Sequence, residues 1–247
     1  MTSLSAGIGQ RQHAGATRKT AARPAADGDS SKSARTRERI LDAAAHVLSR
    51  RGYAGTRLSD VADQAELRAP AIYYYFSSRD DLVEEVIWTG MAHMRDHVSK
   101  ALDALPADTD PMGRIEAAVE AHLRYELGAS DYATASIRNA GQVPGHIHVR
   151  YSAEASEYGD IWRQLVQDAA DAGLLRADLD LQVARMMILG ALNCAAEWWN
   201  PHPGSLETIA RTAQSMVRHG LGCPPVTDEE RPLSRRTRAR KAAANLG

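Results

Sequence analysis

The sequence predicts an all-α fold, in which an N-terminal three-helix helix-turn-helix domain precedes a larger helical domain, with about nine helices in total. Between residues 34 and 221, apolar residues recur every three or four positions, as in helices with one buried face. No stretch alternates apolar and polar residues in the manner of a strand. Proline and glycine interrupt the pattern, most clearly at 144–145 and 200–204.

Composition restricts the class of protein. The chain has 247 residues, of which 44% are apolar and 25% charged, as in ordinary globular proteins. We find no apolar run of about 18 residues that could span a membrane and no secretory signal, so we expect a cytoplasmic protein without a membrane partner. Cys194 and Cys223 make neither a disulfide framework nor a CxxC metal motif, and we expect no cofactor.

The net charge of −1 conceals an uneven distribution. Residues 1–35 carry six basic and two acidic residues, and 36–79 carry seven and five. Residues 83–223 carry eleven basic and nineteen acidic residues, whereas 224–247 carry six and three. A polyanion would therefore be attracted to the N-terminal side of the molecule.

Four segments follow from these patterns. We expect a disordered basic arm over 1–34, a helix-turn-helix DNA-binding domain over 35–82, a helical effector-binding and dimerisation domain over 83–222, and a disordered basic tail over 223–247. The terminal segments are either solvated ends or non-specific phosphate contacts, and the sequence leaves both possibilities open.

Three helices are predicted in the DNA-binding domain, over about 34–51, 58–65 and 69–76, with a stop at Gly52 and a turn at 66–68. Apolar residues of the second and third helices would face one another around a small shared core, with one more filling the turn: Leu58, Val61, Ala62, Leu67, Ile72 and Phe76.

Farther along the chain, Ser78 and Asp81 predict the N-cap of a helix that extends to about 105. Later helical segments are expected at about 111–128, 131–140, 145–173, 179–199 and 205–221.

The third helix would leave a surface of small residues, a proline and tyrosines exposed. Small side chains let a helix enter a major groove closely, and the methyl groups of Ala69 and Ala71 can touch a thymine methyl. Arg68 can reach a guanine edge, and tyrosine hydroxyls suit phosphate oxygens. The predicted DNA-binding residues are Arg57, Ser59, Arg68, Ala69, Pro70, Ala71, Tyr73, Tyr74, Tyr75 and Arg79. Tyr73 and Tyr75 could instead fill the core.

The segments ILDAAAHVLSRRGYAGT, LSDVADQA and AIYYYFSSRDDL together resemble the DNA-binding domain of the tetracycline-repressor (TetR) family. The resemblance covers about a fifth of the chain and implies base contacts near 69–74 and phosphate contacts from Ser59, Tyr73, Tyr75 and Arg79. Two positions depart from the family pattern. Glu66 replaces the usual turn glycine, so we expect a left-handed backbone there at a cost of about 1 kcal/mol. Arg68 replaces a small N-capping residue, which weakens the cap.

The resemblance places a ligand-binding and dimerisation domain in the C-terminal part. Apolar and small residues repeat at helical spacing within 181–199 and 205–221. Two such helices from each of two chains would close a four-helix interface, so we expect a homodimer through the last two helices on a double-stranded, palindromic operator. The alternative is that both stripes belong to the core of one chain.

An apolar pocket with few polar groups is predicted inside this domain, for a small-molecule effector. The candidate lining residues are Trp88, Met91, Met94, Leu123, Tyr132, Trp162, Met187, Asn193 and Trp198, with Ile137 and Leu165 as further candidates. The EWWNPHPGS segment resembles a TetR subgroup, some of whose members sense acyl-thioester or lipid-type catabolites. The resemblance therefore implies a ligand-responsive regulator, most simply a repressor.

Two other classes of protein were weighed. An architectural DNA-binding protein without an effector would share the same head. An enzyme is not expected, because the chain has no nucleophile elbow, Walker loop, dinucleotide fingerprint or His-Glu-x-x-His motif. His93 and His97, four residues apart, and the pair His146 and His148 have no companion ligands at suggestive spacing, so no metal site is predicted.

Overall fold

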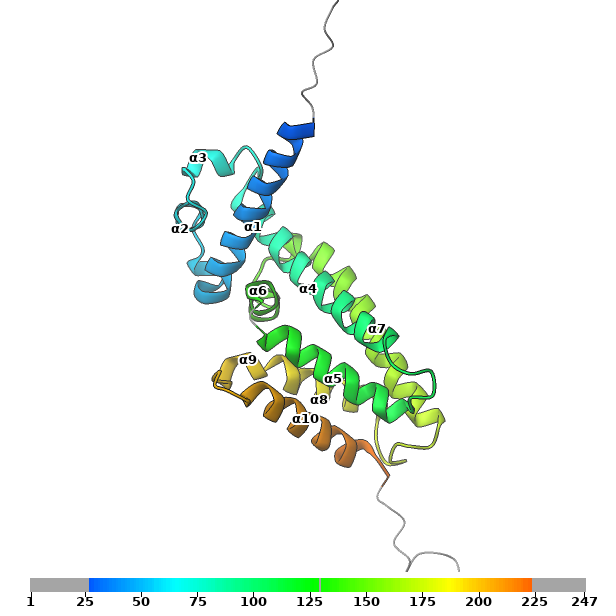
Figure 1. The fold of residues 1–247 in the computed structure, drawn as a ribbon. Helices are drawn as coiled ribbons and strands as arrows, with labels where there is room; N and C mark the ends of the chain where they lie inside the picture. Colours follow the sequence, from blue (N-terminus) through cyan, green and yellow to red (C-terminus); the bar gives the residue numbers. More distant parts are fainter. Residues whose placement is uncertain (1–26, 129, 224–247) are drawn as a thin grey trace, which may run out of the picture. The chain divides into compact units, whose positions relative to one another are not determined.

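The computed structural model describes residues 27–128 and 130–223, in two compact units, 1–36 and 37–247. Of the predicted tail over 223–247, residues 224–247 lie outside the described residues, as do the first 26 residues of the predicted arm. Cys223 is described, and its amide donates to the Leu174 carbonyl at 3.0 Å, so this residue is part of the ordered structure. The elements are α1 (Asp27–Gly55), α2 (Leu58–Gln64), α3 (Ala69–Ile72), α4 (Arg79–Asp103), α5 (Pro111–Leu127), α6 (Asp131–Asn139), the 3₁₀ turn η1 (Gly145–Ile147), α7 (Val149–Asp171), α8 (Leu181–Asn193), α9 (Ala195–Trp198) and α10 (Ser205–Leu221) (Figure 1).

The described residues confirm the all-α prediction; their only β feature is an isolated bridge between Leu175 and Gly222. Several helix boundaries differ from the prediction. The predicted helix over 145–173 begins at Val149, after η1, and the predicted helix over 179–199 is divided into α8 and α9. Helix α1 begins at Asp27, because the segment 31–39 contains neither glycine nor proline and is rich in helix-forming Ala, Arg, Lys and Glu. Residues 27–34, predicted to belong to the arm, are therefore helical.

The third helix is shorter than predicted. Helix α3 ends at Ile72 rather than at Phe76, and the chain continues in tight turns, in which the Tyr75 amide donates to the Ile72 carbonyl at 2.9 Å. Bulky aromatic side chains lose rotamer freedom in a helix, and three consecutive tyrosines weaken the helical tendency here. The turns nonetheless bring Phe76 into the core, where it is 6% exposed.

Side-chain caps explain where several helices begin. The predicted Ser78 cap is confirmed, because its hydroxyl accepts the Asp81 amide at 3.0 Å. Asp110 caps α5 by accepting the Gly113 amide at 3.0 Å, and the Asp180 carboxylate does the same for the first turn of α8. Each cap satisfies a backbone donor that the helix itself leaves free.

Two apolar cores organise the unit that begins at Arg37. The first lies between α1, α2 and α3 and the start of α4, and it contains the predicted Val61, Ala62, Ile72 and Phe76. The second lies between α4, α5, α7, α8 and α10 and surrounds the fully buried Trp162. Helix α4 supplies residues to both cores, so it connects the helix-turn-helix head to the larger helical domain (Figure 1).

Helices α4 and α6 cross closely at Gly90. A Cβ atom built on Gly90 would lie 2.3 Å from the Tyr132 carbonyl oxygen and 2.7 Å from the Ser136 Cβ. Only a residue without a side chain permits this approach. The Ser136 hydroxyl donates to the Ile87 carbonyl at 2.7 Å and holds the two helices together beside the crossing.

Candidate functional site

The head exposes the surface that the sequence predicts for DNA. Tyr73 is 58% exposed and Tyr74 is 81% exposed, although large aromatic side chains are usually buried. Arg57, Ser59, Arg68 and Pro70 are also exposed, whereas Ala69, Ala71 and Tyr75 are half-buried. The structure thus brings basic, small and tyrosyl side chains of the α2–α3 region to the surface without burying them in the monomer.

The turn before this surface shows both predicted departures. Glu66 has a φ of 54°, the one positive value outside glycine among the described residues. Arg68 occupies the N-cap of α3 without a side-chain hydrogen bond to the helix, and a proline lies in the first turn. Proline needs no hydrogen-bond partner for its nitrogen there, so it partly offsets the weak cap.

Arg79 is less available than the sequence suggested. Its Nη2 lies 2.9 Å from Asp80 Oδ1, and its guanidinium lies over the Tyr53 ring, 4.3 Å from the centroid. The Tyr53 hydroxyl also donates to Asp80 at 3.1 Å. Although partial burial acts to raise the pKa of Asp80, the hydrogen bonds from Arg79 and Tyr53 hold that pKa below its ordinary value. Arg79 therefore positions the start of α4, and a phosphate would have to compete with Asp80 for it.

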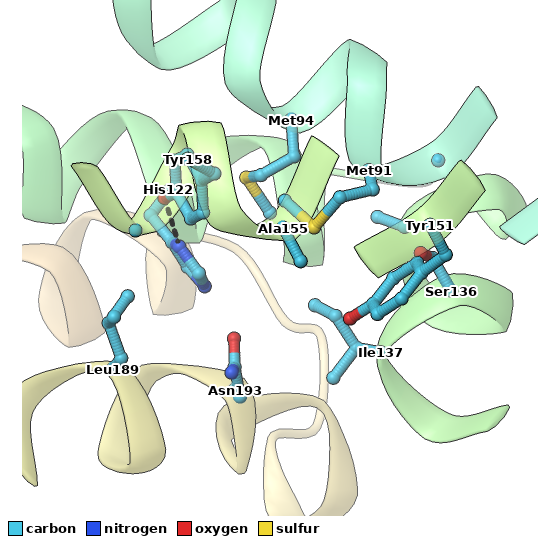
Figure 2. Close-up of a pocket in the computed structure, with 13 residues that line it drawn as sticks. Met91, Met94, His122, Ser136, Ile137, Tyr151, Ala155, Tyr158, Leu189 and Asn193 are labelled. Carbon is cyan, nitrogen blue, oxygen red and sulfur yellow. Dashed lines mark hydrogen bonds between the residues drawn. The ribbon is translucent and has the colours of Figure 1, made fainter. Parts of the chain in front are cut away.

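A cavity of ≈ 160 Å³ lies inside the larger domain, between α4, α5, α6, α7 and α8. Figure 2 shows His122 at one side and Tyr151 at the other, with Met91 and Met94 between them. The lining residues are Gly90, Met91, Met94, His122, Ala133, Ser136, Ile137, Tyr151, Ala155, Tyr158, Gly159, Leu189 and Asn193.

The cavity contains only part of the predicted lining. Met91, Met94, Asn193 and the further candidate Ile137 line it. The other predicted residues lie in the core, on the surface or in a separate groove. These residues lie on helices that the sequence predicted, but apolar periodicity alone does not distinguish the helix faces that line the cavity from those that do not.

Trp162 and the further candidate Leu165 are buried in the core. Trp88 lies under the Arg150 guanidinium at 4.1 Å, and the Tyr132 hydroxyl donates to Asp42 at 2.9 Å. A separate groove contains the remaining three, Leu123, Met187 and Trp198.

The polar wall of the cavity was missed by the sequence reasoning. His122 is 1% exposed, and its Nδ1 shares a 2.7 Å hydrogen bond with the Tyr158 hydroxyl (Figure 2). Its Nε2 lies 3.3 Å from Glu126 Oε2, at an angle that makes no hydrogen bond. Burial raises the pKa of Tyr158, which therefore keeps its proton. The spacing of His122 and Glu126, one helical turn apart on an otherwise apolar face of α5, was the available signal.

Helix α6 connects this cavity to the head. Ala133, Ser136 and Ile137 line the cavity. Side chains at both ends of α6 form hydrogen bonds with the second half of α1. The Asp131 carboxylate accepts hydrogen bonds from the His46 Nδ1 and from the Ser49 hydroxyl, each at 2.9 Å.

The other end of α6 makes backbone contacts with α1. The fully buried Asn139 accepts the Tyr53 amide at 2.7 Å and donates to the Leu48 carbonyl at 3.4 Å. Arg138 donates to the Ser49 carbonyl at 3.3 Å. A displacement of α6 would therefore be transmitted to α1 directly.

An apolar groove of ≈ 650 Å³ runs along α8 and α10. Met187 and Met216 are each 70% exposed, Trp198 is 65% exposed and Val183 is 58% exposed, and all four line it. An exposed apolar surface of this kind is typical of an interface with another molecule.

The histidines examined as metal ligands have other neighbours. His93 packs beside Tyr132 and His97 beside Tyr125, with ring centroids 6.0 and 5.5 Å apart. Within residues 27–128 and 130–223, no group of three or more His, Cys, Asp or Glu side chains is placed to hold a metal ion. No helix in that part of the chain has the length and apolar content needed to cross a bilayer.

Comparison with known proteins agrees with this arrangement. The family model for bacterial regulatory proteins of the tetR family matches residues 40–86, and the model for the tetracyclin repressor-like C-terminal domain matches residues 108–221. The HTH-type transcriptional repressor KstR2 of Rhodococcus jostii is 27% identical over 205 residues, which cover 81% of this chain and 98% of the relative.

Two solved structures share the fold. The ketosteroid transcriptional regulator KstR2 of Mycobacterium tuberculosis has a TM-score of 0.67 at 17% identity, covering 76% of this chain and 95% of that one. AibR, in complex with isovaleryl coenzyme A and operator DNA, has a TM-score of 0.67 at 21% identity, covering 74% and 97%.

A helix-turn-helix head joined to a helical domain defines a DNA-binding transcriptional regulator, not an enzyme. The two family models match separate parts of the chain, the head and most of the larger domain, in the order found in such regulators. The protein belongs to the TetR family.

Proposed function

We propose that the protein is a homodimeric repressor that binds a palindromic operator and is released by a small, largely apolar effector. The exposed surface around Arg68, Tyr73 and Tyr74 carries this proposal. A merely structural helix bundle has no need to expose two neighbouring tyrosines beside a basic side chain. In the proposed division of labour, residues 35–82 bind DNA and 83–222 bind the effector and the second chain.

The proposed DNA contacts are of two kinds. Ala69, Pro70 and Ala71 approach the base edges, where Arg68 can donate to guanine. Tyr74 joins them at the bases, whereas Ser59, Tyr73 and Tyr75, with Arg57 beside them, approach the phosphates, which set the register without reading the sequence. Arg79 contributes in the same role once its bond with Asp80 is shared with a phosphate.

The proposed effector site is the cavity beside α4 and α6. An acyl-thioester or related lipid-type catabolite agrees with its mainly apolar lining and with the ligand of AibR, isovaleryl coenzyme A. A cavity of about 150 Å³ in another protein holds a benzene molecule, so this one admits a group of about six carbon atoms. The rest of a coenzyme A thioester would lie outside it.

The proposed release follows from the contacts of α6. A ligand that displaces Ser136 or Ile137 also displaces Asp131 and Asn139, which hold α1 by hydrogen bonds. The effector acts only if it binds the non-operator conformation more tightly, by a few kcal/mol for a useful response. Helix α4 follows, because it crosses α6 at Gly90.

The test begins with selection of bound sequences from a random duplex pool. We expect a palindrome whose half-sites lie about one helical turn apart. Arg68→Ala should weaken binding to the selected site by about tenfold and relax one base position, whereas Arg163→Ala, on the exposed face of α7, should leave binding unchanged. A selection that returns no symmetric site would contradict the proposal.

The alternative function is a DNA-binding protein without an effector. The cavity and its polar wall argue against it, because a fully packed interior would serve that function as well. Operator affinity that stays constant across a panel of acyl thioesters, ketones and hydrophobic acids would favour the alternative.

A further inference from the structure

We infer that His122 anchors the effector through a neutral carbonyl oxygen, so the cavity accepts a ketone, ester or thioester and rejects the corresponding carboxylate. The inference rests on the proposed effector site and specifies its chemistry. Three observations support it: a buried ring nitrogen without a hydrogen-bond partner, the carboxyl group beside it, and the size of the space in front of it.

The first observation is the unused hydrogen-bonding capacity of His122. Nearly all buried polar atoms have a hydrogen-bond partner. The Tyr158 hydroxyl satisfies Nδ1, yet Nε2 has no hydrogen-bond partner among the described residues, although the side chain is 1% exposed and lines the cavity. We infer the tautomer in which the Tyr158 hydroxyl donates to Nδ1, so that the imidazole proton lies on Nε2. That N–H is a donor suited to a ligand oxygen.

The second observation is a buried carboxyl group beside the imidazole. Glu126 is 2% exposed, and neither of its carboxyl oxygens has a hydrogen-bond partner in the part of the chain that the structure describes. Its Oε2 lies 3.3 Å from His122 Nε2. A ligand carboxylate at His122 would therefore face a second carboxyl group in a buried site, where water screens repulsion poorly.

The lining has no side chain with a permanent positive charge to pair with a ligand anion. None of the thirteen residues that line the cavity is Arg or Lys. Arg185 approaches the lining residue Gly159, but its Nη1 donates to the Gly159 carbonyl at 2.9 Å. Regulators that bind carboxylates would be expected to supply a bidentate arginine instead. A carbonyl group accepts the Nε2 proton without bringing a charge, so the cavity favours neutral ligands.

The third observation is the available space. The ≈ 160 Å³ cavity has methionine side chains from α4 facing Leu189 of α8, and His122 lies at one side of it (Figure 2). This arrangement suits a compact alkyl group of about six carbons attached to the carbonyl that His122 binds. A long acyl chain would not fit without displacing α6 or α8.

The experiment compares two ligands of the same shape. Methyl isobutyl ketone and isovalerate share the isobutyl group and the carbonyl carbon. The ketone carries a methyl group on that carbon, where isovalerate carries a charged oxygen. Isovaleryl N-acetylcysteamine thioester is the third probe, because it carries the same acyl group without the coenzyme. Binding to the full-length protein is measured by calorimetry and by thermal shift. We expect the ketone and the thioester to bind at least about tenfold more tightly than the acid.

Three variants test the residues. His122→Phe should weaken ketone and thioester binding by about tenfold or more. Glu126→Gln replaces the carboxyl group by a neutral amide of the same shape, so it should narrow the difference between ketone and acid by about tenfold. Glu120→Gln, the same change on a partly exposed part of α5, should leave the difference unchanged. A destabilised fold alone would weaken both ligands equally, so the ratio separates anchoring from a structural role.

The outcomes distinguish a failure of this inference from a failure of the proposed operator function. Equal binding of ketone and acid, or tighter binding of the acid, overturns the inference, and so does the absence of binding by all three probes. An unchanged ketone-to-acid ratio in Glu126→Gln also overturns it. The proposed operator function is judged separately, from the selected DNA site and the Arg68→Ala variant, neither of which requires a ligand.

Discussion

Glu66 holds a left-handed backbone at the turn of the helix-turn-helix, with a φ of 54°. An L-residue in this conformation costs roughly 1–2 kcal/mol. We expect Glu66→Gly to relieve that strain and to stabilise the protein by about 0.5–1 kcal/mol, after the greater chain entropy of glycine in the unfolded state is subtracted. Chemical denaturation measured by circular dichroism checks the value.

A matched control lies three residues earlier. Asp63 belongs to α2, and glycine there should destabilise the protein by about 0.5–1 kcal/mol, because it adds chain entropy without relieving strain. A Glu66→Gly protein that is less stable than the parent would show that the turn is not strained. The sequence alone predicted this residue's conformation, since a turn of known type leaves few backbone choices.

The residues of the cavity were harder to predict. Met91 and Met94 line it as expected, but Trp162, on an equally apolar helix face, is packed in the core. Apolar periodicity reports which face of a helix is buried, and it does not report whether that face meets another side chain or a cavity. His122 was not predicted, because its one local signal is its spacing of one helical turn from Glu126 on an otherwise apolar face of α5.

At the level of elements, helix positions followed well from proline, glycine and capping residues. Ser78 caps α4 as predicted, and α10 occupies the predicted range. The end of α3 and the start of α1 did not follow, since both depend on modest helix propensities that tertiary packing can override. The hydrogen bonds between α6 and α1 were also unpredictable, because they join residues more than eighty positions apart.

Gly90 is the position at which two elements depend on one missing side chain. Alanine normally stabilises a helix relative to glycine by about 1 kcal/mol. We nonetheless expect Gly90→Ala to destabilise the protein by about 1–3 kcal/mol, because its Cβ would lie 2.3 Å from the Tyr132 carbonyl oxygen. Thermal unfolding gives the measurement. Gly141→Ala is the comparison, since a Cβ there meets nothing within 4 Å, and a destabilisation no larger than in that variant would contradict the close crossing.

Asp131 offers a test of the link between α6 and α1. Asp131→Ala removes the acceptor for His46 and for the Ser49 hydroxyl. We expect the ratio of operator affinities without and with a cavity ligand to fall about fivefold, because part of the coupling free energy is lost. Fluorescence anisotropy with labelled operator DNA measures both affinities.

Asp160→Ala, on the exposed part of α7, is the control and should preserve the ratio. An Asp131→Ala protein that responds to ligand as strongly as the parent would show that the hydrogen bonds of Asp131 carry none of the coupling. Either result bears on the route of the signal and not on the operator site itself.

At the scale of the whole molecule, the exposed apolar groove along α8 and α10 is suited to an occupant. A second copy of the chain is the natural one, because a palindromic operator needs two heads related by a two-fold axis. The alternative from the sequence, that both stripes are internal, is true only in part. Ile188 and Ala210 face the core, whereas Met187 and Met216 remain exposed.

We expect Met187→Glu and Met216→Glu, separately and together, to convert the dimer to a monomer, because each places a charge in an apolar interface. Operator affinity should then fall at least about a hundredfold, since one head loses the effective concentration that its partner supplies. Sedimentation velocity reports the mass, and anisotropy reports the affinity. Met186→Glu makes the same change at a residue that is 56% exposed but does not line the groove, so its dimer should persist. Groove variants that still sediment as dimers would place the two-fold axis elsewhere, whereas monomers with full operator affinity would separate DNA recognition from symmetry.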